Sequence, residues 1–428
     1  STDSARALLE GRLSFPTLVE ARLHGMSDAD VDPALDDSRT VSSTPLGSGA
    51  VNTVSLVTYT DGAQYVFKPE APGRQMMEGL TLSKDYAAEQ QVAQLNLATQ
   101  SVANALGLGD TVPKCTVGSH KGDYGLFMEK VPGLDGSAFG KGKAAPPGSL
   151  GAKDVRDLGD EDHGKVLGGI LRGLNRLEWL DLIAGQGDRH AHNYLVDVRP
   201  DLTVTVKGID NDQCFPEYRT GLHTYVLKDK EANLFLEHCG NAIRAYPAKY
   251  QDEIRARFEN DPGITKNPDG SITLDTTKFE NGELFYAAQA AIGMHGCTLP
   301  EFIDEDLYAH LLTLKSGSPQ RDALMKDLAT RLPPGALDSA AKRLDEAIAH
   351  AEALASQGKV VRNADFSKRD VQNQLFYREL HGPSSPVKPV KGYSLPSASD
   401  VVRKSKHQVR SLFVRDLFAG VAKKGWFV

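Results

Sequence analysis

The chain has little of what would tie it to a disulfide scaffold or to a membrane. Only four of its 428 residues are cysteines, and no two of them form a CxxC pair, which argues against a disulfide framework and against a zinc finger. No apolar run approaches the roughly 18 residues that a membrane span requires, and the start carries no recognisable secretory signal. We therefore expect a soluble protein of a cytosol-like compartment, with reduced thiols and no transmembrane segment.

Positive charge is scarce in most of the chain and concentrated at its end. The net charge is −7, but residues 359–428 hold 14 Lys and Arg against 5 Asp and Glu, so this segment carries +9 and the remainder −16. An acidic body does not suit nucleic acid, which we do not expect as a partner. For the basic tail two interpretations stay open: its terminal helix docks on the acidic body, or it makes peripheral contact with an anionic membrane.

The order of patterns along the chain predicts an α+β fold with two lobes, since 428 residues are enough for two cores. Period-2 runs follow Val41, a hairpin signal lies at Asp61-Gly62, and one long helical pattern runs from Ser83 to Leu106. Further helical patterns lie at 164–184, 229–259, 283–293, 301–314, 319–331 and 335–357. We divide the chain into a lead-in (1–40), a small antiparallel β lobe with one long helix (41–132), a Gly- and Pro-rich connection (133–152), a larger, mainly helical lobe (153–357) and a basic tail with a terminal amphipathic helix (358–428).

Polar residues concentrate in the stretch GQGDRHAHNYLVD, residues 185–197, which runs directly into a strand-like segment. A turn and a second strand follow, and then the acidic DND at 210–212. A hairpin would return the chain to its starting edge and bring Asp210 beside Asp188 and Asn193. Two carboxylates and an amide oxygen form a site suited to Mg²⁺ on phosphates. In phosphoryl transfer one Asp orients or deprotonates the nucleophile, while an Asn and a second Asp hold the metal.

The β-rich lobe has the parts that a nucleotide would need. Gly47, Ser48 and Gly49 lie between two strand-like runs, where backbone N–H groups could cover phosphates. Lys68 lies in the strand YVFKPE, and the following helical pattern turns Glu89 inward, where it could pair with that lysine. The strand LFMEKVPG would lead into a hinge whose backbone, from Glu129 to Val131, is available to an adenine.

These motifs resemble the atypical kinase branch that contains the phosphatidylinositol 3- and 4-kinases, actin-fragmin kinase and the HipA-type toxin kinases. DRHAHN, residues 188–193, fits the DRHxxN catalytic loop of that branch, and IDNDQCFP, residues 209–216, is similar to its IDNG-like metal stretch. The resemblance covers roughly residues 41–240. It implies a bilobal kinase-like fold with Asp188 as the catalytic aspartate, Asn193 and Asp210 as Mg²⁺ ligands, and Lys68 on the ATP phosphates.

Several residues around this motif have more than one interpretation. Arg189 would stabilise either the loop or phosphate charge, and we expect a buried His190 to brace the loop, so both join Asp188 in the predicted catalytic set. The pair His190 and His192 could instead mark a metal-dependent hydrolase. Asp181 fits the end of a helix with a supporting role. Asp212 replaces a glycine of the related stretch and is either an extra metal ligand or a turn residue.

The predicted function is transfer of the γ-phosphoryl group of ATP with Mg²⁺, or Mn²⁺ in its place. The eight residues after Asp210 include Asp212 and Glu217 and no base, so we expect a Ser or Thr hydroxyl of a protein as acceptor. A phosphoinositide hydroxyl is the alternative, and a pseudokinase-like binding module is the other class. The Ala- and Gly-rich composition suggests a bacterial source and, by analogy alone, an effector kinase delivered into a host cell and acting on a host protein.

Overall fold

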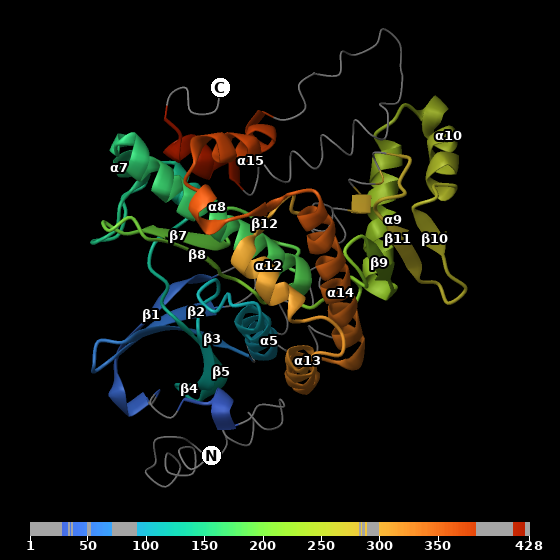
Figure 1. Ribbon diagram of the computed structural model, residues 1–428. Coiled ribbons are helices and arrows are strands. Elements are labelled where there is room, and N and C mark those ends of the chain that lie inside the picture. The colour runs from blue at the N-terminus through green and yellow to red at the C-terminus, as the bar shows by residue number, and fades with distance from the viewer. Residues whose placement is uncertain are drawn as a thin grey trace.

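The computed structural model describes residues 28–32, 35, 37–48, 53–70, 92–281, 284, 287–288, 299–381 and 414–423. In this part of the chain a small β lobe lies against a larger, mainly helical lobe (Figure 1). The predicted α+β arrangement, with a small antiparallel β lobe and a larger, mainly helical lobe, is confirmed. None of the described helices combines the length and the apolar character needed to cross a membrane.

The small lobe is built on an antiparallel sheet with the strand order β1-β2-β3-β5-β4. Its strands are β1 (Thr40–Ser48), β2 (Thr53–Tyr59), β3 (Gln64–Pro69), β4 (Cys115–His120) and β5 (Asp123–Glu129). The predicted hairpin at Asp61-Gly62 joins β2 to β3: Asp61 accepts a hydrogen bond from the Ala63 N–H at 3.0 Å, and Gly62 takes the left-handed φ of 81°. Asp and Gly are common in such turns because they tolerate these conformations.

Helix α5 (Val92–Ala105) belongs to the cores of both lobes. Ala93 and Leu97 pack with the inner side chains of β4 and β5. Leu95 and Val102 pack instead with helices of the large lobe. The helix ends as predicted, just before Gly107, whose φ is 68°; the first part of the predicted helix, including Glu89, lies outside the described residues.

The large lobe is organised around α8 (Asp160–Ala184), whose first turn holds three acidic residues that suit a helix N-terminus. The other helices are α6 (Gly136–Gly140), α7 (Ala152–Asp157), α9 (Asp229–Arg244), α10 (Ala248–Glu259), α12 (Glu305–Leu312), α13 (Pro319–Arg331), α14 (Pro334–Ser356) and α15 (Arg369–His381). The patterns predicted at 319–331 and 335–357 are thus confirmed as helices. The pattern at 283–293 lies mostly outside the described residues.

Two predicted helices differ in detail from the structure. The pattern at 229–259 is two helices, because Pro247 lies between them and a proline ring clashes with a continuing helix. The pattern at 301–314 begins with the short strand β12 (Ile303–Asp304) before α12. There Asp304 accepts hydrogen bonds from the N–H groups of Asp306 and Leu307 and caps the helix.

A second sheet carries the loops of interest. It has the order β6-β7-β8, with β6 (Leu134–Asp135), β7 (Tyr194–Val198) and β8 (Val204–Gly208). The Gly- and Pro-rich stretch 133–152 therefore contains a strand and the short helix α6 as well as loop. A third sheet, β10 (Ile264–Lys266), β11 (Ile272–Asp275) and β9 (Thr224–Leu227), packs with α9 and α10 around a core of its own, at the right of Figure 1.

Two described segments beyond α14 pack on the large lobe. Strand β13 (Val360–Val361) pairs in parallel with β12. A helical segment at 414–421 buries the side chains of Val414, Leu417, Phe418 and Val421 in the core formed with α6, α7 and α8. Asp416 accepts a hydrogen bond from the Ser137 hydroxyl at 2.9 Å. The apolar face of this segment is therefore covered by the protein itself.

Candidate active site

The loop at 185–193 is held between α8 and β7. Gly185 ends α8 in the left-handed conformation, with φ at 71°. A Cβ atom there would lie 2.9 Å from Pro216 and 3.0 Å from the Arg343 guanidinium, so the turn requires glycine both for its backbone and for its close packing. The chain then enters β7 at Tyr194, which pairs with Gly208 of β8.

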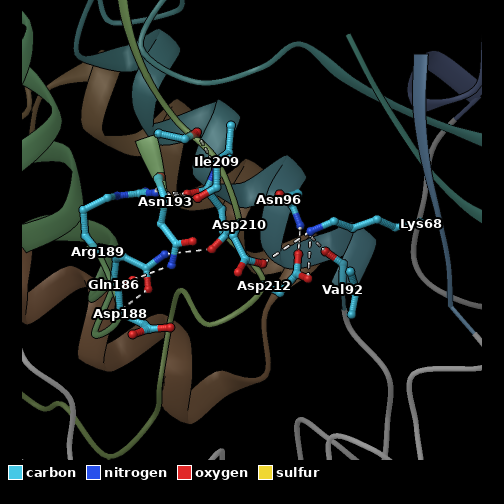
Figure 2. A network of polar contacts seen from close by, with 12 residues as sticks. Lys68, Val92, Asn96, Gln186, Asp188, Arg189, Asn193, Ile209, Asp210 and Asp212 are labelled. Carbon is cyan, nitrogen blue, oxygen red and sulfur yellow. Dashed lines mark hydrogen bonds and ion pairs between the residues drawn. The ribbon is translucent and has the colours of Figure 1, made fainter. Parts of the chain in front are cut away.

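The β7–β8 hairpin brings the two predicted loops together. The Ile209 N–H donates to the Asn193 carbonyl at 2.9 Å, which extends the ladder by one bond beyond the strands. Asp210 follows with a φ of 58°, a left-handed conformation that is uncommon for a residue other than glycine. The structure thus places Asp210 beside the loop that holds Asp188 and Asn193 (Figure 2).

Arg189 is the buried brace of this loop. Its side chain is 1% exposed and makes a two-pronged ion pair with Asp181, at 2.9 and 3.0 Å. It also donates to the Asn193 carbonyl at 2.5 Å, to the Ile209 carbonyl and to the Asn211 side-chain oxygen at 2.6 Å. Burial works against the charged form, but the Asp181 carboxylate raises the pKa of Arg189 above its ordinary value. Of its two predicted roles, the contacts match stabilisation of the loop.

His190 differs from the prediction, because its side chain is 31% exposed instead of buried. Its Nδ1 accepts from the His192 N–H at 3.1 Å, and its Nε2 lies 3.2 Å from the Asn193 side-chain nitrogen and 3.9 Å from the Asp188 carboxylate. Arg189 is buried instead of His190, because the Asp181 carboxylate lies beneath the loop and a buried carboxylate requires a cationic partner. Asp181, in the last turn of α8, has the supporting role that its position suggested.

Gln186 is a site residue that sequence reasoning missed. It is fully buried, accepts a hydrogen bond from the Asp188 N–H at 3.0 Å and donates to the Asp210 carbonyl at 3.0 Å. It therefore joins the backbones of the two predicted active-site aspartates directly (Figure 2). A glutamine between two glycines carries no local signal for this position.

The Asp188 carboxyl is partly buried between the two loops. Burial raises its pKa, the nearby His190 lowers it, and the Asp210 carboxylate raises it. The Asn193 side-chain nitrogen donates to the Asp188 carbonyl at 2.7 Å. Because that bond and the His190 contact both use the nitrogen of the amide, its oxygen points the other way.

Lys68 reaches this site from the small lobe. Its ammonium lies 3.0 Å from an Asp212 oxygen and 3.4 Å from an Asp210 oxygen. Burial works against its charge, but both carboxylates hold the pKa of Lys68 above its ordinary value. Glu89, the predicted partner, lies outside the described residues, so that pairing stays a prediction. Asn96 of α5, which sequence reasoning also missed, donates to Asp212 at 2.8 Å.

The other predicted nucleotide-binding residues are placed in part. Gly47 and Ser48 end β1, and Gly49 lies outside the described residues. The Glu129 N–H already donates to the Lys114 carbonyl at 2.9 Å, and its carboxylate pairs with Lys207 at 2.7 Å. Val131 makes no backbone hydrogen bond with the part of the chain that the structure describes. Of the two expected hinge residues, Val131 is thus the one with an open backbone.

The donor set fits a hard divalent cation. The Asp210 side chain is 49% exposed, and its one polar contact within the described residues is the 3.4 Å approach of Lys68. Asn193 turns its amide oxygen away from its own loop. Carboxylate and amide oxygens are ligands that Mg²⁺ accepts alongside phosphate and water. Within the described residues, no three or more His, Cys, Asp or Glu side chains gather as a metal cluster, so nothing described favours the His-based metal-dependent hydrolase.

Comparison with known proteins gives loose structural likenesses only. No family model matches the sequence, and no curated protein matches it. Among solved structures, the chain is similar to the Helicobacter pylori proinflammatory kinase CtkA, with 12% identity, a TM-score of 0.30, and coverage of 74% of this chain and 95% of that one. The Golgi casein kinase with Mn/ADP bound gives 12% identity and a TM-score of 0.35 over 75% of each chain. Vaccinia related kinase 3 gives 13% identity and a TM-score of 0.27 over 74% of this chain and 98% of that one.

Proposed function

We propose that the protein is an ATP- and Mg²⁺-dependent phosphotransferase that acts on Ser or Thr hydroxyls of a protein substrate. The observation that carries the proposal is the approach of Lys68 to the carboxylate of Asp210, at 3.4 Å, across the two lobes. A cation from the small lobe and a carboxylate from the large lobe thus lie together, with Asp188 and Asn193 beside Asp210 (Figure 2). Phosphoryl transfer needs this combination, because its catalysis is mainly positioning and charge stabilisation.

Each residue has one task in this scheme. Lys68 contacts the α- and β-phosphates, and Asp210 and Asn193 hold Mg²⁺, which would neutralise charge on the phosphates; Mn²⁺ is the alternative metal. Asp188 takes the proton of the acceptor hydroxyl as the hydroxyl oxygen bonds to the γ-phosphorus. The bond between that phosphorus and the β–γ bridging oxygen breaks, and ADP leaves. Burial, which raises the pKa of Asp188, makes it a better proton acceptor than an exposed aspartate.

The surroundings of the metal loop favour a protein acceptor over a phosphoinositide. The first base after Asp210 is Arg219, which is buried, donates to the Leu222 carbonyl and lies over the Tyr225 ring at 5.8 Å. It is committed to the protein interior and cannot meet an inositol phosphate. On the other side of the catalytic loop His192 pairs with Asp135 at 3.4 Å. A neutral or basic peptide suits this edge better than a lipid headgroup does.

The experiment offers γ-labelled ATP with Mg²⁺ to three acceptors: the protein alone, a host-cell lysate and phosphoinositide vesicles. The expected product is label on Ser or Thr, with none on lipid, and the Asp188→Asn variant should give no label. Label on lipid alone would replace the protein acceptor by the phosphoinositide alternative. ATP binding without transfer to any acceptor would favour the pseudokinase-like module. Use of a eukaryotic host lysate also addresses delivery into a host cell, which is part of the proposal by analogy only.

A further inference from the structure

We propose that Asp212 is the residue that positions Lys68, and that Asn96 of α5 holds Asp212 in place. The inference rests on the proposed function, because it concerns the lysine of the nucleotide site. It assigns different tasks to the two aspartates of the DND stretch: Asp210 faces the metal, and Asp212 fixes the lysine without binding metal.

The contacts of the two aspartates separate these tasks. Asp212 uses one oxygen for Lys68, at 3.0 Å, and the other for the Asn96 side-chain nitrogen, at 2.8 Å, and its side chain is only 10% exposed. Asp210 is about half exposed and, among the residues that the structure describes, has one long polar contact, with Lys68. Asp212 is thus enclosed and bound on both oxygens by the protein, whereas the more exposed Asp210 is the aspartate that a metal ion can reach.

Asp212 also differs from the turn aspartates of this chain. Asp201, Asp269 and Asp275 each accept a hydrogen bond from the backbone N–H two residues ahead, at 3.0, 2.9 and 3.0 Å. This local bond is what makes aspartate common in turns. Asp212 makes no such bond, and both its partners, Lys68 and Asn96, are more than a hundred residues away in the sequence. Local turn formation therefore does not explain it.

The orientation of Asn96 follows from its neighbours. Its side-chain nitrogen donates to Asp212 and, at 2.9 Å, to the Val92 carbonyl of its own helix. Both partners can only accept, so the nitrogen must face them. The Asn96 oxygen is left buried without a hydrogen-bond partner in the described part of the chain, which is unfavourable. The hydrogen bond from the Asn96 nitrogen to Asp212 is thus maintained although it leaves the Asn96 oxygen unpaired.

The contacts from Lys68 to Asp212 and from Asp212 to Asn96, here called the relay, join three parts of the fold (Figure 2). Lys68 lies on β3, Asn96 on α5, and Asp212 in the loop after β8 of the large lobe. A buried ammonium without an anionic partner is strongly unfavourable, so the buried Lys68 side chain keeps its place only while that loop lies against it. The position of the small-lobe lysine is thereby set by a carboxylate of the large lobe.

The test compares Asp212→Asn and Asn96→Leu, singly and together, with the exposed turn variant Asp201→Asn as the matched control. Mg-ATP binding and the kcat and KM of transfer are measured at low and high Mg²⁺. Both single variants should bind Mg-ATP more weakly and lose kcat by on the order of 10²-fold at most, the range for a misplaced catalytic group. The double variant should lose little more than either single one, high Mg²⁺ should restore nothing, and the control should match wild type.

Three results would overturn the inference. Recovery of Asp212→Asn at high Mg²⁺ would make Asp212 a metal ligand, and normal behaviour of Asn96→Leu would remove the relay. Glu89→Gln is measured in the same way, and a loss confined to it, with Asp212→Asn like wild type, would make Glu89 the partner of Lys68.

A second measurement separates this inference from the proposed function. Urea unfolding without nucleotide is compared for Lys68→Met, Asp212→Asn and the double variant. Each single variant should lower the midpoint, and the double variant should lower it by less than the sum of the two shifts, because paired residues are not additive. Additive shifts would refute the Lys68–Asp212 coupling. If the variants show this coupling but the wild-type protein transfers no phosphate, the proposed function is refuted and the Lys68–Asp212 inference stands.

Discussion

Replacing Arg189 by methionine tests whether this arginine braces the loop at 185–193 or acts on phosphate. The substitution Arg189→Met keeps much of the side-chain length and removes the guanidinium. It leaves the Asp181 carboxylate, which is buried at the end of α8, without its cation. It also removes the donors to the Asn193 and Ile209 carbonyls and to the Asn211 side chain.

The expected loss of stability is large. Removal of one partner of a buried ion pair costs about 3–5 kcal/mol, because an uncompensated charge remains. Natural domains unfold with only about 5–15 kcal/mol, so this loss is a major part of the total. The double variant Asp181→Leu, Arg189→Met should regain much of it, since it leaves no unpaired charge in the core. Burial already raises the pKa of Asp181. In the single variant the unpaired carboxyl is charged at high pH and protonated at low pH, so the loss of stability relative to wild type grows as the pH rises and shrinks as it falls.

The assay is urea unfolding of the three proteins, followed by transfer activity under conditions in which each is folded. The expected order of stability is wild type, double variant, single variant. An Arg189→Met variant that unfolds within about 1 kcal/mol of wild type, the scale of ordinary point substitutions, and still loses all transfer would place Arg189 on the phosphates and contradict the brace.

Three further outcomes are expected. Asp210→Asn should abolish transfer and weaken Mg-ATP binding, whereas Asp188→Asn should abolish transfer and spare binding; two variants that turn over like wild type would refute the kinase assignment. Gln186→Met should lower kcat more than it raises KM, because the substitution frees two loop backbones that the buried glutamine joins, and steady-state kinetics with an unchanged kcat would contradict this. Burial lowers the pKa of His163, although the hydrogen bond that its Nε2 donates to the Val421 carbonyl favours the charged form. Protonation should therefore loosen residues 414–421, so the protection factors of their amides, corrected for the intrinsic pH dependence of exchange, should fall as the pH drops below the ordinary histidine value of 6.5, with Lys423 opposing and Asp160 favouring the protonation. His163→Gln should remove that pH dependence; a variant that keeps it would assign it elsewhere.

Local patterns predicted the elements of this fold better than its long-range contacts. The hairpin at Asp61-Gly62 and the β7–β8 hairpin depend on neighbouring residues, and their spacing alone brings Asp210 to Asp188. Whether Arg189 or His190 is buried depends on the Asp181 carboxylate beneath the loop, and the pattern around the motif does not encode that. The sequence of a polar loop does not show which of its side chains point toward the core.

The contacts of Asp212 were likewise not predictable from local patterns. Its partners are Lys68 and Asn96, and neither spacing nor periodicity relates residues so far apart. Pro247 is a different case: the signal was present, but the helical periodicity on both sides of it was taken as one helix.

Helix α5 determines how the two lobes can open and unfold. Because one face of it lies in the core of the small lobe and the other in the core of the large lobe, neither lobe can unfold without exposing apolar surface of the other. Calorimetry should therefore show the small lobe unfolding together with the part of the large lobe that packs on α5, in one transition, while the separate core of α9, α10 and the third sheet is not bound to that transition. The slowest amide exchange of the small lobe is likewise expected in α5.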